Sequence, residues 1–254
     1  MRIKRKVGII IAALGSLLLA VSGAVPALAG NGPAAGFSHV TGLRFAGTVT
    51  AKSTGFAGWV FGAKAAKSVT AEFKIPTLKC TSTPSGIAPS SALVTGTTAA
   101  PKVSAATVLL ACSSGKPVMI PAVIVNGTET NGSQVVHTGD LMKATVTTSA
   151  TATAATIADL TAGHTFSFKK SGTGGTSFRE LIIDSAVGQG TTQFPVVNFG
   201  KISYTNGAVS GKAIGSVTPQ ASVNMETTGN VLQILTGAIT GTAKNAFLTT
   251  FKHA

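Results

Sequence analysis

The chain has 254 residues, of which 44% are hydrophobic and only 11% are charged, and its formal net charge is +13. The hydrophobic content excludes a disordered chain, and the scarcity of charge means that Thr, Ser, Asn and Gly must form most of the surface. Beyond residue 29 the basic residues are scattered singly except for Lys169–Lys170, and no basic stripe is interleaved with aromatic residues. Since nucleic-acid binders carry such a stripe, the composition argues against nucleic acid as a partner.

Residues 1–29 have the layout of a secretory signal peptide. Four of the first six residues are basic, an apolar run follows over 7–21, and Ala27 and Ala29 occupy the small-residue positions of a cleavage site. The apolar run is shorter than the roughly 20 residues that a membrane-spanning helix needs. We therefore expect cleavage after Ala29, which lowers the net charge by four to +9. The released protein is expected to be secreted, or retained at the cell wall, without a membrane anchor.

Two cysteines, Cys80 and Cys112, remain in the exported chain. An even pair in such a chain usually forms a disulfide, which here would close a loop of about thirty residues and contribute roughly 3 kcal/mol. The four histidines lie far apart and match no zinc-binding spacing. The sequence therefore predicts a Cys80–Cys112 disulfide, no metal site and no cofactor.

Alternation of polar and apolar residues with a period of two dominates the chain after a flexible leader over 30–36. The clearest runs are 67–76, 141–149, 155–168 and 200–206, and Asn-Gly or Gly-rich turns separate them. The low-complexity segment 150–155 is predicted to be a turn between two strands. Many short strands without an amphipathic helix predict an all-β fold, a two-sheet antiparallel β-sandwich that forms a single domain over 37–254.

Two short polar motifs have a structural and a functional interpretation. His137 and Asp140 in VVHTGDLM could serve acid–base chemistry, but Asp and Gly favour turns through their backbone preferences, so we predict a turn at a strand entry. Asn126-Gly-Thr and Asn131-Gly-Ser match the glycosylation sequon, and they equally match hairpin turns.

The segment SFRELIIDSA, residues 177–186, places two of the chain's 7 acidic residues in an apolar run. Because side chains alternate along a strand, Glu180, Ile182 and Asp184 are expected to share one face, and Glu180 could face a groove.

Four segments in the same order resemble the glutamic endopeptidase family, the eqolisins, and in particular its bacterial relatives. They are GWVFGAKAAKSVTAEFKIPTLKC (58–80), HTGDLMKATVT (137–147), IADLTAGHTFSF (157–168) and RELIIDSAVGQGTTQFPVVNFGKISYTN (179–206). The resemblance implies a concanavalin-A-like jelly roll and a catalytic pair of one glutamate and one glutamine. It places the glutamate, the general base, at Glu180.

The same resemblance leaves the catalytic pattern incomplete. The family glutamine falls on Leu110 in ATVLLACSS, and the aromatic substrate strand of the family is replaced by VMIPAVIVNG, residues 118–127. A leucine supplies no hydrogen bond to a water or an oxyanion, and losing one such donor costs roughly a hundred- to a thousandfold in rate.

Three hypotheses follow. The favoured one is a non-catalytic exported sandwich that binds a peptide, a protein or an anionic cell-wall polymer in the former substrate groove. The second is an active acid endopeptidase in which Glu180 works with Asp184 as a secondary acid, although the spacing along one strand is large for a shared proton. The third is a carbohydrate-binding module, which the scarcity of Trp and Tyr disfavours because sugar sites rely on aromatic rings with a polar edge.

Overall fold

The computed structural model describes residues 48–63, 65–97, 100–189 and 192–254. The predicted signal peptide and leader lie outside the described residues. Within the described ranges the chain forms eighteen strands and one short 3-10 helix, η1 (Ile214–Ser216). Nothing in those ranges forms a helix that is both long and apolar enough to cross a membrane.

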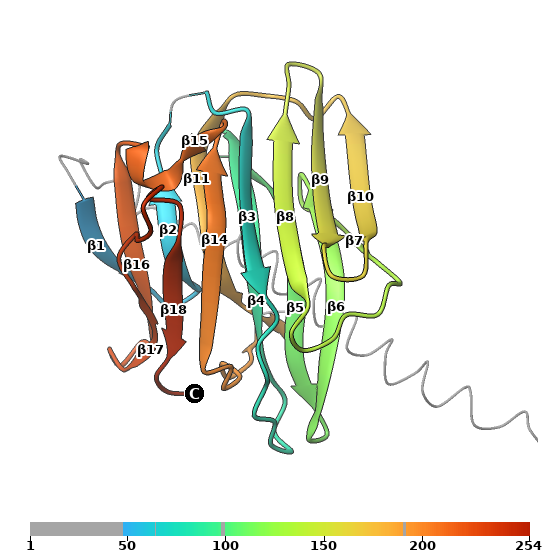
Figure 1. Ribbon diagram of the computed structural model, residues 1–254, viewed down its shortest axis with the longest axis vertical. Helices are drawn as coiled ribbons and strands as arrows, with labels where there is room; N and C mark the ends of the chain where they lie inside the picture. Colours follow the sequence, from blue (N-terminus) through green and yellow to red (C-terminus); the bar gives the residue numbers. More distant parts are fainter. Residues whose placement is uncertain (1–47, 64, 98–99, 190–191) are drawn as a thin grey trace, which may run out of the picture.

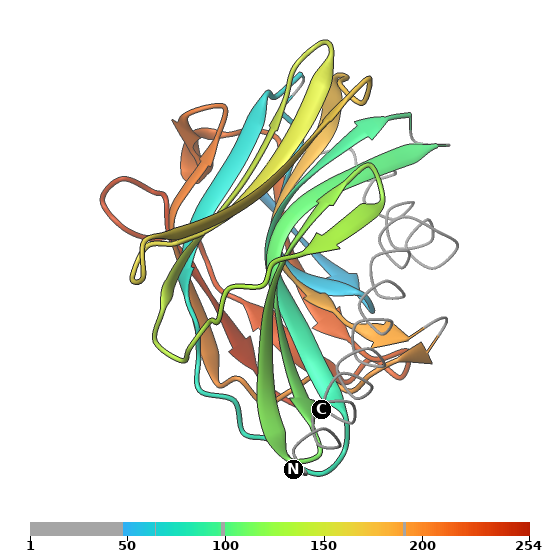
Figure 2. The same ribbon diagram turned by 90° about the vertical axis from the view of Figure 1, so that its right-hand side faces the viewer.

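The strands form two layers, which Figure 2 shows from the side. The front layer, toward the viewer in Figure 1, contains six strands that pair in the following order. They are β10 (His164–Ser171), β9 (Ala152–Asp159), β8 (Leu141–Thr148), β3 (Ser68–Lys74), β14 (Lys201–Val209) and β18 (Phe247–Phe251).

The back layer lies behind the front layer in Figure 1 and continues the same hydrogen-bonded path. It contains β2 (Phe56–Phe61), β11 (Ser177–Ala186), β4 (Ser85–Gly96), β5 (Pro101–Ser113), β6 (Lys116–Val125) and β7 (Thr128–Asn131). Along one side β17 (Leu232–Thr236) and β16 (Gln220–Glu226) connect the layers, since β17 pairs with β18 and β16 pairs with β2.

Four short strands complete the described part of the chain: β1 (Thr48–Ser53), β12 (Gly188–Gln189), β13 (Thr192–Gln193) and β15 (Lys212–Ala213). The ladders are antiparallel with one exception, because β1 pairs with β16 in parallel. The predicted all-β antiparallel sandwich is therefore confirmed, and the parallel β1 strand is an addition to it.

The two layers differ in how many of their faces are buried. In β3, β8 and β9 every second residue is buried. These strands therefore bury one face against the back layer and expose the other to solvent. In β4 and β5 nearly every residue is buried, on both faces. The core between the layers contains stacked aromatic rings, since Tyr204 of β14 stacks on Phe247 of β18 with ring centroids 4.6 Å apart.

The predicted disulfide is confirmed. Cys80 and Cys112 are bonded, with their Cα atoms 5.4 Å apart. The bond ties the segment after β3 to the end of β5, so it fastens the front layer to the back layer.

Candidate functional site

Strand β11, which carries both candidate carboxylates, lies in the middle of the back layer between β2 and β4. Its apolar centre, Leu181 to Ile183, suits a strand that is covered on both sides. The Ile182 side chain packs against Gly207 of β14 in the front layer. Glu180 and Asp184 share the face of Ile182, so both carboxylates point between the layers.

Glu180 is completely buried and its carboxylate is hydrogen-bonded on both oxygens. The backbone N–H of Ala63 donates to Oε2 at 2.9 Å, and the Ser177 hydroxyl lies 2.7 Å from Oε1. Ser177 also contacts the Ala66 carbonyl oxygen at 2.8 Å. The side chain therefore connects β11 to the segment that follows β2, instead of standing free at a surface.

Burial raises the pKa of Glu180 from 4.5 to about 7. The hydrogen bonds from Ser177 and Ala63 and the positive charge of Arg179 lower this pKa, but they offset the desolvation only in part. Below neutral pH the group is thus mainly a neutral acid within the sandwich.

Asp184 is also completely buried, in a separate environment. The Tyr204 hydroxyl from β14 lies 2.6 Å from Oδ1 of Asp184 and 3.0 Å from the Ile183 carbonyl oxygen. The Tyr204 hydroxyl has one proton to donate. The shorter contact indicates that it donates this proton to the Asp184 carboxylate. The other carboxylate oxygen, Oδ2, has no hydrogen-bond partner within the described part of the chain.

Burial raises the pKa of Asp184 from 3.8 to about 6, while the hydroxyls of Thr249 and Tyr204 lower it. The Thr249 hydroxyl also lies 3.5 Å from the Ile202 carbonyl oxygen, which is long for a hydrogen bond. Burial and the adjacent carboxylate raise the pKa of Tyr204 well above its usual value, so Tyr204 stays protonated and remains a donor.

The two carboxylates are too far apart to share a proton. They are four residues apart on one strand, which at about 3.3 Å per residue separates their Cα atoms by roughly 13 Å. Ile182 lies between them on the same face and is fully buried. They form two separate buried acids, each hydrogen-bonded to its own neighbours.

Leu110, the position to which the family resemblance assigned the glutamine, lies far from Glu180. Through the ladder of β11, β4 and β5, Glu180 is level with Leu93 and Ser104, whereas Leu110 is level with Ala186. Six residues along the strand separate the two levels, which is roughly 20 Å. The structure therefore does not bring Leu110 and Glu180 together.

One glutamine does lie level with Glu180 on the same face. Gln220 of β16 is paired with Phe61 of β2, and Phe61 is paired with Glu180. Two strand spacings, about 9.6 Å, separate Glu180 from Gln220. The fully buried Phe61 lies on the strand between them, with its side chain on the same face. Oε1 of Gln220 is buried and has no partner among the described residues.

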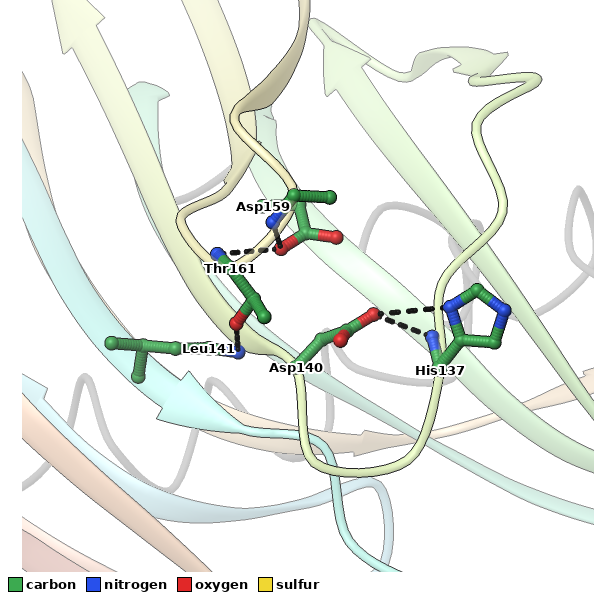
Figure 3. Close-up of polar contacts among 6 residues, drawn as sticks. His137, Asp140, Leu141, Asp159 and Thr161 are labelled. Carbon is green, nitrogen blue, oxygen red and sulfur yellow. Dashed lines mark hydrogen bonds and ion pairs between the residues drawn. The ribbon is translucent and has the colours of Figure 1, made fainter.

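His137 and Asp140 form the predicted turn rather than an acid–base pair, as Figure 3 shows. Oδ2 of Asp140 accepts the backbone N–H of His137 at 2.6 Å and lies 3.6 Å from Nδ1 of the same residue, whose side chain is largely exposed. Gly139 between them has φ +95°, a conformation that glycine adopts without strain. Asp159 plays the same part in the next turn, where Oδ1 accepts the N–H of Thr161 at 2.9 Å.

Sequence reasoning missed Tyr204 and Ser177, whose hydroxyls hydrogen-bond to the two acids. The signal for Tyr204 was present, because alternation in GKISYTN places the chain's one tyrosine on the inner face, where its hydroxyl must find a partner. Ser177 gives no such signal, since its contact with Glu180 depends on an irregularity in the β11–β4 register between Ser177 and Arg179. No group of three or more His, Cys, Asp or Glu gathers as a metal site in the described ranges.

Fold and site together define an all-β, two-layer sandwich that carries acidic residues on a central strand of one layer. The chain belongs to the Peptidase A4 family, whose model matches residues 54–245. A search of curated protein sequences returned no match.

Solved structures of glutamic peptidases are similar to this chain. Scytalido-glutamic peptidase with a transition-state-analogue inhibitor is 13% identical, with a TM-score of 0.62, over 79% of this chain and 99% of that one. SCP-B, an eqolisin in complex with the tripeptide Ala-Ile-His, is 14% identical with a TM-score of 0.61 over the same shares. Aspergilloglutamic peptidase from Aspergillus niger is 18% identical, with a TM-score of 0.52, over 65% of this chain and 99% of that one. At these identities the likeness establishes the fold.

Proposed function

We propose that this chain is an exported, non-catalytic member of the glutamic peptidase family that binds a peptide or polymer instead of cleaving one. The observation that carries the proposal is the complete burial of both candidate carboxylates. The Glu180 carboxylate is hydrogen-bonded to Ser177 and to the Ala63 backbone, and the Asp184 carboxylate is hydrogen-bonded to Tyr204.

The chemistry of peptide hydrolysis explains why burial matters. A general base must lie within hydrogen-bond reach of the water that it activates, and that water must reach the scissile carbonyl. Both oxygens of Glu180 already have protein partners. An amide donor aimed at the oxyanion is needed as well, and the residue level with Glu180 on β5 is Ser104 in place of a glutamine.

One alternative has a specific observation in its favour. An active acid endopeptidase would use Glu180, whose pKa of about 7 suits a group that both accepts and donates a proton, with Gln220 as the amide partner. It would require Phe61 to move out of the space between the two side chains and water to enter.

A proteolysis assay separates the two functions. The purified protein and its Glu180→Gln and Asp184→Asn variants are incubated with a denatured protein over acidic to neutral pH, and circular dichroism checks that each variant is folded. We expect no cleavage above the level of the Glu180→Gln variant at any pH. Cleavage by the unaltered protein that disappears in a folded Glu180→Gln variant would establish the endopeptidase instead.

A further inference from the structure

The outward face of the front layer, here called the front face, is rich in hydroxyl side chains. The central row crosses four strands and contains Thr70, Thr145, Thr156 and Ser167, which the ladder registers place side by side. The Thr70 and Thr145 hydroxyls are 2.9 Å apart and hydrogen-bonded. At about 4.8 Å per strand the row is roughly 14 Å long. The row above it contains Ser68, Thr147, Ala154 and Lys169.

The front face is open to solvent. The inward residues of β3, β8 and β9 are buried, whereas their outward neighbours are half-buried or exposed. Figure 1 looks directly onto β3, β8, β9 and β10, and no described strand or helix crosses in front of them. The hydroxyl rows are therefore available to a partner.

Four lysines also lie on the front face. Lys169 is in the upper row, and Lys143, Lys74 and Lys201 lie two, four and six residues below the central row, which is roughly 7, 13 and 20 Å. Glu72 is the one carboxylate that alternation places on the described part of this face. Its Oε1 lies 3.7 Å from Nζ of Lys143, and its Oε2 accepts the Asn206 side-chain amide at 2.7 Å. The other three lysines have exposed side chains, so the front face carries a net positive charge.

The residue types on the front face restrict the chemistry of its partner. The aromatic side chains of β10, Phe166 and Phe168, pack against the core, so the described part of this face has no aromatic ring to stack on sugars or bases. It also lacks the Trp, Tyr and Arg anchors that stabilise protein–protein interfaces. Phosphate oxygens, in contrast, accept hydrogen bonds from both lysine and Ser or Thr side chains.

We propose that the front face docks an extended phosphodiester-linked polyol, the chemistry of an anionic cell-wall polymer. The lysines would ion-pair with the phosphates, and the Thr156 and Ser167 hydroxyls would donate to phosphate oxygens. The Thr70 hydroxyl already donates to the Ala144 carbonyl, so Thr145 donates to Thr70 and would accept a hydrogen bond from a polyol hydroxyl. Nucleic acid shares the phosphates, but the absence of stacking rings on this face favours the polyol. The inference concerns a different surface from Glu180 and Asp184, so it stands or fails independently of peptidase activity.

Binding of purified poly(glycerol phosphate) tests the proposal. Calorimetry is performed at low salt and at about 0.15 M salt, where screening weakens exposed ion pairs. The test variant replaces Lys74, Lys169 and Lys201 by Gln. The matched control replaces three exposed lysines outside the front face, Lys79, Lys102 and Lys116, by Gln, so that both variants lose the same net charge.

At low salt the test variant is expected to bind on the order of a hundredfold more weakly than the unaltered protein, while the control variant changes only a few-fold. A second variant, Thr145→Val with Thr156→Val, keeps every charge and should lower the affinity without changing its salt dependence. Equal losses in the test and control variants, or no binding at low salt, would overturn the proposal. Equally tight binding of single-stranded DNA with the same number of phosphates would overturn the choice of the polyol.

Discussion

Replacing Glu180 by Gln should stabilise the protein at alkaline pH and leave it almost unchanged in acid. The Ser177 hydroxyl has one proton and two oxygen neighbours, Oε1 of Glu180 at 2.7 Å and the Ala66 carbonyl at 2.8 Å. When Glu180 is protonated, its proton can go to Ser177 while Ser177 donates to Ala66. A glutamine reproduces that arrangement, with its amide N–H toward Ser177 and its oxygen toward the Ala63 N–H.

The magnitude follows from the pKa difference between the folded and the unfolded chain. The pKa of Glu180 is about 7 in the folded protein and 4.5 in the reference state. Between these values the folded protein holds more protons than the unfolded chain, so its stability falls as pH rises through that window. At about 1.4 kcal/mol per pH unit, ionising the buried acid costs about 3 kcal/mol once the pH is above 7.

The assay is guanidinium unfolding of the unaltered protein and Glu180→Gln at about pH 4.5 and about pH 8. The variant should exceed the unaltered protein by about 3 kcal/mol at the higher pH and by less than about 0.5 kcal/mol at the lower. Glu72→Gln, which makes the same chemical change on the front face, is the control and should show no such gain at the higher pH. A gain that is equal at both pH values, or a loss at the higher pH, would refute the burial argument.

Three further changes have expected outcomes. Tyr204→Phe removes the donor to Asp184 and should lower the free energy of unfolding by about 1–3 kcal/mol above pH 6, where Asp184 is charged, and by much less below it. A loss that does not depend on pH would contradict the role of the hydroxyl. Joint replacement of Cys80 and Cys112 by Ser should lower the free energy of unfolding by roughly 3 kcal/mol, and an unchanged denaturation midpoint would show that the bond does not restrict the unfolded chain. Leu110→Ala should cost about 2–5 kcal/mol in the same measurement, whereas a cost below about 1 kcal/mol would contradict its place in the core.

The sequence predicted the front layer far better than the back layer, and solvent explains the difference. The four clearest alternating runs all belong to β3, β8, β9, β10 and β14 of the front layer. Their outward faces are polar because water covers them. In β4 and β5 both faces are buried, so the sequence shows no alternation and periodicity gives no signal.

The segment 150–155 shows a second limit of sequence interpretation. It was predicted to be a turn, but β9 already begins at Ala152, and Thr153 pairs with Thr148 of β8. Small residues are weak strand formers on their own, and here the ladder to β8 overrides their preference. The turn itself is confined to the preceding residues, where the Ser149 N–H donates to the Ala152 carbonyl.

For the candidate site, the sequence predicted the shared face of Glu180 and Asp184 correctly but not its surroundings. Alternation alone cannot say whether a face meets solvent or another layer, because that depends on which strands lie opposite. Tyr204 is twenty residues away from Asp184 in sequence, and Ala63 is more than one hundred residues from Glu180. Only the packing of the two layers brings these groups together.

The most direct test of the account is a search for peptide-bond hydrolysis with a mixed peptide library, read by mass spectrometry. The unaltered protein and Glu180→Gln are incubated with the library from acidic to neutral pH, and new peptide termini are counted. The account predicts the same profile for both proteins. Termini produced by the unaltered protein and absent with a folded Glu180→Gln variant would show that Glu180 reaches a substrate, which contradicts a purely structural role for this buried acid.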